Sequence, residues 1–199
     1  NNLPKLTKTN KYDVEIENLD GYQLEKFNKY YLQEIISNSN SIYRAVINAY
    51  YWIGNNLYDI GDKNLGYYSK IQTSLTNYFK GLVINWLLDI KNKDIYDKNL
   101  KSYLNIDYDN IYSYIYNISS IENTTSDNIV TLFILNQIIK IPIIIYNNLF
   151  KIIYIFDSEI KNVNGDNIKK YNENKDYISV LYEYSDRTYP NIIKTIHFI

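Results

Sequence analysis

The run Ile141–Tyr146 reads I-P-I-I-I-Y and is continuously apolar, with mostly β-branched side chains. A strand with one face in water alternates apolar and polar residues, whereas a strand covered on both faces is apolar throughout. The run therefore predicts a central strand of a sheet that has covering elements on each side.

The first two-thirds of the chain supplies the candidate covering helices. Apolar residues recur there at the three- and four-residue spacing of a buried helix face. Longer helices are expected at 22–36, 41–52 and 71–89, and shorter ones at 94–103, 107–117 and 129–139. Further strands are expected at 150–156, 177–184 and 191–199, with a short edge strand at 12–17. Polar loops are expected at 37–40, 54–66 and 162–174.

These patterns predict an α+β fold, with one mixed sheet of about five strands packed between helices. Residues 1–11 are polar and are expected to form an N-terminal arm. Residues 12–199 are expected to form a single domain, because a chain of this length can bury a core without disulfides or metal.

Composition excludes several classes of function. The chain has 21 Lys+Arg against 22 Asp+Glu, so it has no basic surplus to hold a nucleic-acid backbone. It has no cysteine, which excludes disulfides, iron–sulfur clusters and cysteine-ligated zinc, and its one histidine excludes a multi-histidine metal site. Its six glycines form no P-loop or dinucleotide-binding fingerprint. We therefore expect no cofactor, no metal and no nucleic-acid partner.

Four residue types with A/T-rich codons dominate the sequence: 34 Ile, 29 Asn, 24 Tyr and 19 Lys among 199 residues. This bias indicates an AT-rich genome. The longest apolar stretch, 138–146, is far shorter than the roughly 20 residues that span a bilayer, so no membrane span is expected. With no recognisable targeting signal, a cytoplasmic location is favoured. Methionine is absent even at position 1, so we expect either a domain of a larger polypeptide or assembly, or a processed product.

The stretch 37–49 reads S-N-S-N-S-I-Y-R-A-V-I-N-A, a polar turn that leads directly into a helix. Ser41 falls at the first turn of that helix. The positive end of the helix dipole and free backbone N–H groups at such a position can activate a nucleophile or hold an oxyanion. The same pattern also fits a simple structural role, in which Asn40 or Ser41 is the N-cap.

The segment 38–46, N-S-N-S-I-Y-R-A-V, resembles the D-G-N-C-L-F-R-A-V motif of the ovarian-tumour (OTU) cysteine proteases. Ser41 falls on the nucleophilic cysteine, Asn38 on the acidic residue and Ser39 on the glycine of the loop that helps to form the oxyanion hole. Downstream, 125–146 is similar to a helix followed by the family's strand N-V-P-I-x-V-Y. The positions identical to the motif are Asn40, Arg44, Ala45 and Val46.

The resemblance, which spans about 34–184, implies a papain-type cysteine protease fold. It also implies hydrolysis of isopeptide bonds at the C-terminal tail of ubiquitin or a ubiquitin-like protein, the expected partner. The family's general base is a histidine followed by an aromatic residue at the start of the last strand. Loop length aligns Thr188 with this histidine, and residue type aligns His197 with it. Asn38 would then serve the oxyanion hole or orient the base.

Ser41 makes the chain inactive as written, because a hydroxyl is not deprotonated near neutral pH without a much better base than a thiol needs. The leading interpretation is a degenerate OTU-like module, a pseudoenzyme. One alternative is an active deubiquitinase seen as a Cys-to-Ser mutant, with His197 as its base. Another is a secreted RNA-cleaving toxin that uses His197 with Glu15 or Glu17 and Arg187, against which the near-neutral charge speaks.

Overall fold

The computed structural model describes residues 3, 24–27, 30–35, 40–52, 65–117, 125–172, 177–183 and 192–198 of the 199-residue chain. The strands are β1 (Leu24–Phe27), β2 (Tyr30–Glu34), β3 (Ile143–Tyr146), β4 (Ile152–Asp157), β5 (Glu159–Lys161), β6 (Ile178–Glu183) and β7 (Ile192–Phe198). The α-helices are α1 (Ser41–Trp52), α2 (Leu65–Leu88), α3 (Lys93–Asn99), α4 (Lys101–Leu104), α5 (Ile111–Asn117), α6 (Thr125–Ile139) and α7 (Gly165–Asn172). Two 3₁₀ turns, η2 (Ile90–Asn92) and η3 (Tyr108–Asn110), precede α3 and α5.

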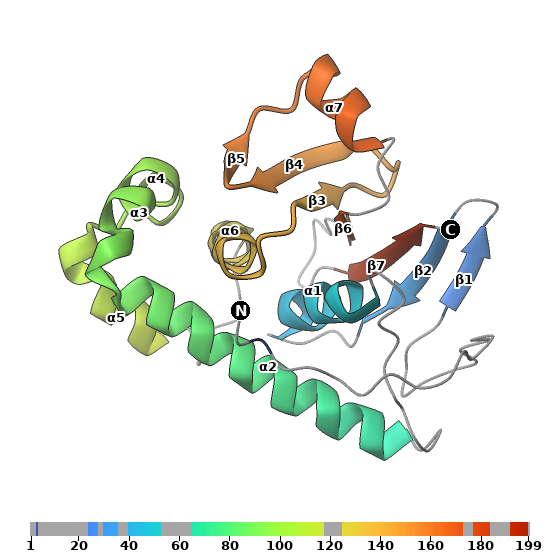
Figure 1. Ribbon diagram of the computed structural model, residues 1–199, viewed down its shortest axis with the longest axis horizontal. Coiled ribbons are helices and arrows are strands. Elements are labelled where there is room, and N and C mark those ends of the chain that lie inside the picture. Colours follow the sequence, from blue (N-terminus) through green and yellow to red (C-terminus); the bar gives the residue numbers. More distant parts are fainter. Residues whose placement is uncertain are drawn as a thin grey trace.

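The strands form one sheet in the order β1-β2-β7-β6-β3-β4-β5 (Figure 1). Strands β3 and β6 pair in parallel, and the other neighbours pair antiparallel. The predicted α+β class and mixed sheet are therefore confirmed. Four of the about five expected strands are confirmed as β3, β4, β6 and β7, and the sheet is larger than expected because β1, β2 and β5 also belong to it.

Strand β3 is buried along its whole length, as its apolar sequence predicts. Its side chains alternate between two hydrophobic clusters on opposite faces of the sheet. Ile143 and Ile145 join the larger cluster, which also contains residues of α1, α2 and α6. Ile144 and Tyr146 join the smaller cluster, which contains Tyr171 of α7. The sheet thus lies between helices, as expected.

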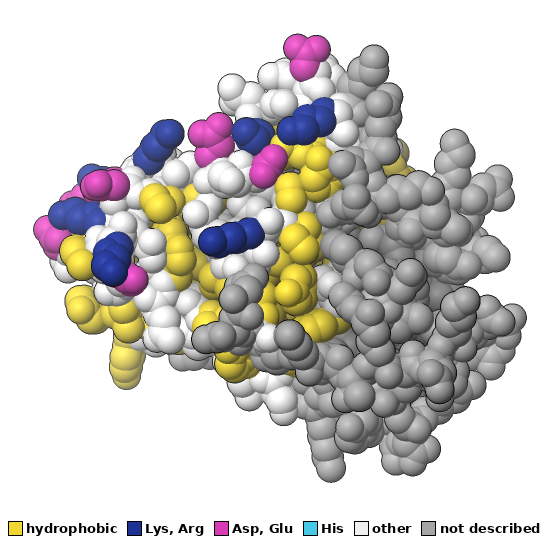
Figure 2. Space-filling model, in the orientation of Figure 1, with side chains coloured by type: hydrophobic (Ala, Val, Ile, Leu, Met, Phe, Trp, Pro, Cys, Tyr) yellow, Lys and Arg dark blue, Asp and Glu magenta, His cyan; other side chains and the backbone are white. Residues whose placement is uncertain are grey.

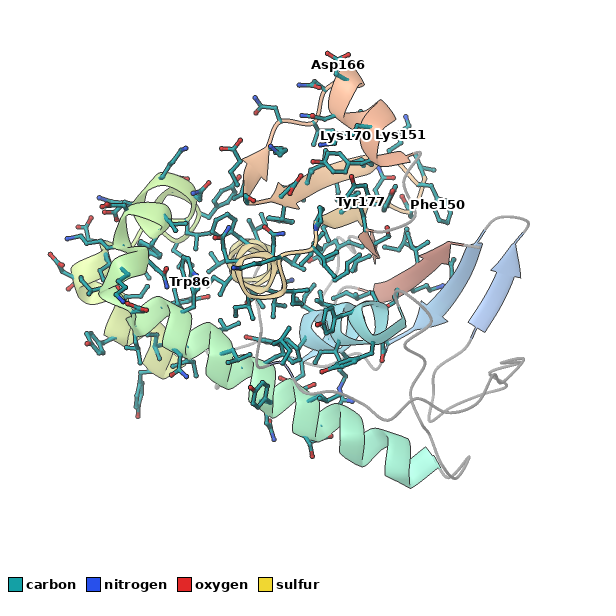
Figure 3. The ribbon with its side chains drawn as sticks, viewed as in Figure 1. Trp86, Phe150, Lys151, Asp166, Lys170 and Tyr177 are labelled. Carbon is teal, nitrogen blue, oxygen red and sulfur yellow. The ribbon has the colours of Figure 1, made fainter. Side chains whose placement is uncertain are left out.

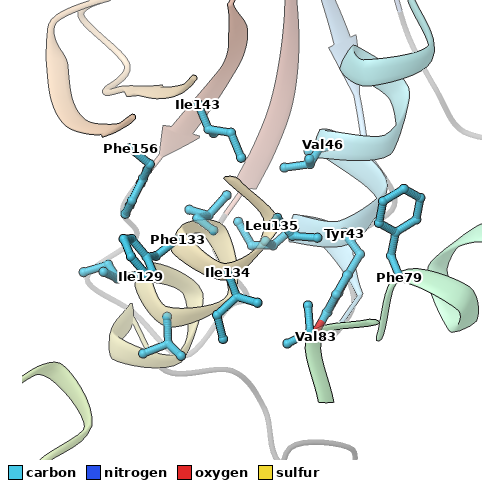
Figure 4. Close-up of a cluster of buried hydrophobic side chains, with 14 of the residues drawn as sticks. Tyr43, Val46, Phe79, Val83, Ile129, Phe133, Ile134, Leu135, Ile143 and Phe156 are labelled. Atoms are coloured by element: carbon cyan, nitrogen blue, oxygen red, sulfur yellow. The ribbon is translucent and has the colours of Figure 1, made fainter. Parts of the chain in front are cut away.

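The larger cluster holds α1 and α6 against the sheet. Helix α1 contacts β6, β7 and α2, and α6 contacts α2, α4 and β4. Figure 4 shows Tyr43 and Val46 of α1 close to Leu135 of α6, with Phe79 and Val83 of α2 beside them. Residues 128–136 of α6 are all buried. A helix enclosed on every side is apolar around most of its surface, and six of these nine residues of α6 are apolar.

The helix predicted at 22–36 is wrong, because this segment forms β1 and β2. Strand β2 pairs with β1 on one side and with β7 on the other. Leu32 and Ile35 are buried in different clusters, on the two faces of the sheet. Pairing with β7 supplies hydrogen bonds and burial that outweigh the weak helical spacing of the apolar residues. Local periodicity could not reveal that pairing.

The polar loop predicted at 162–174 is also wrong in part, because it contains α7. The Asn164 side chain accepts a hydrogen bond from the backbone N–H of Asn167 at 3.0 Å, as an N-terminal cap does. Ile168 and Tyr171 lie three residues apart and pack on the smaller cluster. The helical spacing of these two apolar residues within a polar segment is the sequence signal that predicts α7. The helices expected at 94–103 and 107–117 each divide into two shorter elements.

The other expected helices and strands are confirmed to within a few residues, with the largest shift at α2, which begins at Leu65. Several predictions lie outside the described residues. These are the arm at 1–11, of which only Leu3 is described, the edge strand at 12–17, and residues 37–39 and 54–64 of the expected loops. The division of the chain into an arm and a single domain therefore stays a prediction.

The end of α6 is tied to the sheet by the buried side chain of Asn136. Its amide nitrogen donates to the Ile141 carbonyl at 2.9 Å, and its amide oxygen accepts from the Ser158 backbone N–H at 3.0 Å. Ser158 joins β4 to β5 at a positive φ of 63°. The neighbouring Gln137 donates to the Ser158 carbonyl at 2.8 Å in an exposed position.

We expect Asn136→Ala to lower the free energy of unfolding by about 2 kcal/mol, because it removes two partly buried hydrogen bonds and leaves the Ile141 carbonyl and the Ser158 N–H without this partner. The matched variant Gln137→Ala removes one exposed hydrogen bond to the same turn and is expected to cost less than about 1 kcal/mol. Urea denaturation of both variants measures the two losses. Equal losses would show that burial of Asn136 does not set the size of the effect.

Candidate functional site

The helix that begins at Ser41 forms as the sequence predicts. The first helical hydrogen bond runs from the Arg44 backbone N–H to the Asn40 carbonyl at 3.0 Å. Asn40 therefore occupies the N-cap position, and Ser41 is the first residue of α1. Ser41 thus lies where a nucleophile of an OTU-like site is expected, at the positive end of the helix dipole.

The start of α1 is closed to solvent. Residues 41–49 are all buried, and the Ser41 side chain is only 4% exposed. A nucleophile has to meet a substrate carbonyl at about 3–3.5 Å before it can react. In this conformation Ser41 offers no surface on which a peptide could lie. The position is therefore part of the core rather than of an open cleft.

A buried hydrogen bond joins α1 to the strand that carries His197. The Thr195 hydroxyl donates to the Ala45 carbonyl at 2.9 Å, and Thr195 is fully buried. His197 lies two residues further along β7, where it pairs with Tyr31 of β2. Sequence analysis missed Thr195, although it is the one hydroxyl side chain in the strand I-I-K-T-I-H-F, and that is a signal that could have found it.

The other candidate residues lie outside the described part of the chain. This holds for Asn38, for Thr188 and for the side chain of His197. It also holds for Glu15, Glu17 and Arg187 of the RNA-cleaving alternative. Of the predicted site, the structure therefore describes Ser41 and the backbone of His197. The choice between Thr188 and His197 as the base stays a prediction.

Arg44 links α1 to α2. It is 6% exposed, and its guanidinium donates to the Thr73 hydroxyl at 3.3 Å. A buried guanidinium is costly unless its N–H groups are satisfied by fixed partners, so this contact favours a structural role for Arg44. The packing of α1 is thus a sufficient reason for an arginine at this position. The match of Arg44 to the OTU motif does not by itself indicate a catalytic site.

Tyr43 fixes the first turn of α1 against α6. Its hydroxyl is hydrogen-bonded to the side chain of Thr131 in α6, and burial raises the pKa of Tyr43 to about 12. The Lys80 ammonium lies 5.8 Å from the centre of the Tyr43 ring, and partial burial lowers the pKa of Lys80. The residues around Ser41 are thus held by α2, α6 and β7 together.

A separate groove of about 420 Å³ lies between α3 and the β4–β5 turn. Glu159 pairs there with Lys98 at 3.8 Å and with Lys161 at 3.5 Å. Asp157 accepts a hydrogen bond from the Tyr171 hydroxyl at 2.5 Å. Figure 2 shows cationic and anionic side chains interspersed over the described part of this face. The groove is lined by Asp94, Ile95, Lys98, Asn99, Asp157, Ser158, Glu159 and Lys161.

The described ranges contain neither a cluster of metal-ligand residues nor a membrane-spanning helix. No group of three or more His, Cys, Asp or Glu side chains among these residues could hold a metal ion. Within the same ranges, no helix is long and apolar enough to cross a bilayer.

Comparison with known proteins gives one informative relative. No known protein family matches the sequence. The chain is 32% identical over 210 residues to the uncharacterized protein R327 of Acanthamoeba polyphaga mimivirus. The alignment covers 98% of this chain but only 13% of that protein. The matched part of the relative is therefore a small piece of a much longer polypeptide.

The raised pKa of Tyr43 predicts a loss of stability at high pH. The unfolded chain releases the phenolic proton near pH 10, while the folded chain holds it until about pH 12. The contribution of Tyr43 is therefore complete below pH 10 and is lost as the pH rises toward 12. Between pH 9 and 11, the advantage of the wild type over Tyr43→Phe should shrink by about 1.4 kcal/mol.

Chemical denaturation at both pH values measures this change. Tyr116→Phe serves as the matched control, because Tyr116 is 83% exposed on α5. The stability difference between wild type and Tyr116→Phe gives the baseline for an exposed hydroxyl at each pH. A difference for Tyr43→Phe that does not change relative to this baseline would contradict the burial of the Tyr43 hydroxyl.

Proposed function

We propose that this chain is a non-catalytic OTU-like module, a pseudoenzyme domain that acts within a larger polypeptide. The observation that carries the proposal is the burial of Ser41, which is 4% exposed at the first residue of α1. The position that resembles the family's nucleophile holds a hydroxyl instead of a thiol, and it is packed as a core residue.

The chemistry of Ser41 supports the loss of catalysis. A cysteine at a helix start ionises near neutral pH, whereas a serine needs a base that removes its proton during attack. That base has to lie within hydrogen-bond reach of the hydroxyl. Ser41 is 4% exposed in this conformation, so its hydroxyl has little surface that a substrate could contact. Replacement of the thiol by a hydroxyl and burial of Ser41 both oppose catalysis.

The arrangement of the elements supports the OTU-like, papain-type part of the proposal. A helix that begins at the nucleophile position packs against a mixed sheet, and the Thr195–Ala45 bond joins it to the strand that carries His197. Helix α6 and strand β3 follow the helix–strand order of the second resembling segment. In the proposal, α1 keeps its place in the core and has lost its nucleophile.

A structural or binding role within a longer chain is supported by the relative in the mimivirus, of which the matched segment is 13%. Ubiquitin or a ubiquitin-like protein is the partner that the OTU resemblance implies. In this proposal such a partner is bound without cleavage, or the domain packs against other parts of the polypeptide.

Ser41→Cys tests the proposal, because it restores the nucleophile of the family motif. We expect this variant to form no covalent adduct with ubiquitin vinyl sulfone, since the thiol would be buried. Mass spectrometry after incubation at neutral pH measures the adduct. The chain has no other cysteine, so one thiol titrated by a disulfide reagent in urea confirms that the new side chain is present and reduced.

An adduct would show that the site opens and reacts, and the proposal would be wrong. The double variant Ser41→Cys, His197→Asn then distinguishes the explanations. Loss of the adduct in the double variant would identify an active deubiquitinase with His197 as its base. An adduct that persists would indicate a reactive thiol that does not depend on His197.

A further inference from the structure

The chain contains one Asn–Gly pair among its 29 asparagines, at Asn164 and Gly165, where α7 begins. Asparagine followed by glycine is chemically labile, because the backbone nitrogen of the second residue can attack the side-chain amide carbon of the first and close a five-membered imide. Glycine favours this ring closure, since it has no Cβ to crowd the nitrogen and its backbone reaches conformations that other residues avoid. The place of this pair in the fold therefore decides how readily it reacts.

The packing around Gly165 does not require a glycine. Its φ lies outside the left-handed region, and a Cβ at this position would meet no other atom within 4 Å. Alanine would also be the better helix former at the start of α7. The chain has only six glycines, and the fold gives no steric reason for this one. The property that distinguishes Asn–Gly from Asn–Ala here is its chemical reactivity.

The pair is accessible to water and base, which the reaction needs. Residues 162–166 are all exposed. Figure 3 shows Asp166, in the first turn of α7, at the outer end of the helix and away from Tyr177 and the sheet. Solvent can therefore take the proton from the attacking nitrogen and supply the water that opens the imide.

The N-cap of α7 holds Asn164 in its unreacted form. Its side-chain oxygen accepts from the Asn167 N–H at 3.0 Å, and its carbonyl accepts from the Ile168 N–H at 2.8 Å. Ring closure has to release the side-chain bond, because the amide carbon moves onto the Gly165 nitrogen. The reaction therefore proceeds from states in which the first turn of α7 is open, and such states are most frequent where few buried contacts secure an element.

Contacts with the sheet determine how often α7 opens. The helix has eight residues, and a helix this short depends on tertiary contacts for its stability. Ile168 and Tyr171 pack on the smaller hydrophobic cluster. The Tyr171 hydroxyl also donates to the Asp157 carboxylate of β4 at 2.5 Å. Loss of this hydrogen bond should therefore raise the reactivity of Asn164.

We propose that Asn164 is a deamidation site, at which a slow and irreversible modification alters the start of α7. The Gly165 nitrogen loses its proton to base and bonds to the Asn164 Cγ, while the Nδ2 group takes up a proton and leaves as ammonia. Water then opens the imide at either carbonyl and yields aspartate or isoaspartate at position 164. The net reaction consumes one water and releases one ammonia.

The two products affect α7 in opposite ways. Aspartate keeps the N-cap, and its negative charge is favourable at the positive end of the helix dipole. Isoaspartate adds a methylene group to the main chain and turns the carbonyl that accepts from Ile168 into part of a free carboxylate. The first turn of α7 then loses its cap, and the helix is held less firmly over the smaller cluster. The modification thus changes the charge and the attachment of this helix as the protein ages.

Peptide mapping by mass spectrometry, after prolonged incubation of the folded chain near neutral pH, tests the proposal. We expect more conversion at position 164 than at any other asparagine. Methyl transfer from S-adenosylmethionine by an isoaspartate methyltransferase measures the isoaspartate. No conversion at position 164, or conversion that is no faster there than at asparagines not followed by glycine, would overturn the proposal.

Gly165→Ala separates the chemistry from the fold. It should slow conversion roughly tenfold or more, because its Cβ crowds the attacking nitrogen and restricts the backbone. Its melting temperature should stay the same or rise, since the added Cβ meets no clash and alanine favours a helix. Equal rates of conversion in the wild type and in Gly165→Ala would overturn the proposal.

Tyr171→Phe tests the control of the reaction by α7. We expect conversion to become roughly tenfold faster, because one hydrogen bond to a charged group changes an opening equilibrium by about this factor. Tyr116→Phe is the matched control, because Tyr116 is 83% exposed on α5, and it should leave the rate unchanged. An unchanged rate in folded Tyr171→Phe, or equal acceleration in both variants, would contradict control by α7.

Hydrogen exchange measures the effect of the products on α7. In aged protein enriched in isoaspartate, the backbone amides of Ile168 and Tyr171 should exchange faster than in fresh protein. In Asn164→Asp they should exchange at the same rate or more slowly, because aspartate keeps the cap. Exchange that isoaspartate leaves unchanged would show that the cap does not secure α7 and would overturn the conformational part of the proposal.

Discussion

Burial of β3 on both faces is the constraint from which the remaining architecture follows. A strand with Ile143 and Ile145 on one face and Ile144 and Tyr146 on the other needs an apolar cover on each side. Helices α1 and α6 cover one face, and α7 contributes Tyr171 to the other. Parallel pairing of β3 with β6 and antiparallel pairing of β7 then bring α1 against β6 and β7.

That packing decides what α1 can do. Polar contacts fix the helix on three sides: Tyr43 with Thr131 of α6, Arg44 with Thr73 of α2, and the Ala45 carbonyl with Thr195 of β7. These contacts hold the first turns of α1 in the core, where Ser41 is 4% exposed. An enzyme has to leave its nucleophile accessible at some cost in stability. In our proposal, the domain retains the helix, but the residue at the nucleophile position is no longer accessible to substrate.

Much of the fold could be predicted where one element determines its own pattern. Apolar spacing located α1, α2 and α6, and the β-branched run located β3. The failures are β1 and β2, which depend on pairing with β7 far along the chain, and α7, whose two apolar residues lie in a polar segment. The place of Ser41 at a helix start followed from the local sequence. Its burial did not, because burial depends on how α1 packs against elements far along the chain, such as α6 and β7.

The pKa of a thiol at position 41 is the most direct test of a non-catalytic site. The chain has no cysteine, so Ser41→Cys labelled with ¹³C gives one Cβ resonance whose shift reports ionisation without any need for access. We predict a pKa at or above about 8.5, the ordinary value of a cysteine, because burial disfavours the thiolate. A pKa well below neutral that returns to the ordinary value in the His197→Asn background would contradict the proposal and indicate a preserved cysteine–histidine pair.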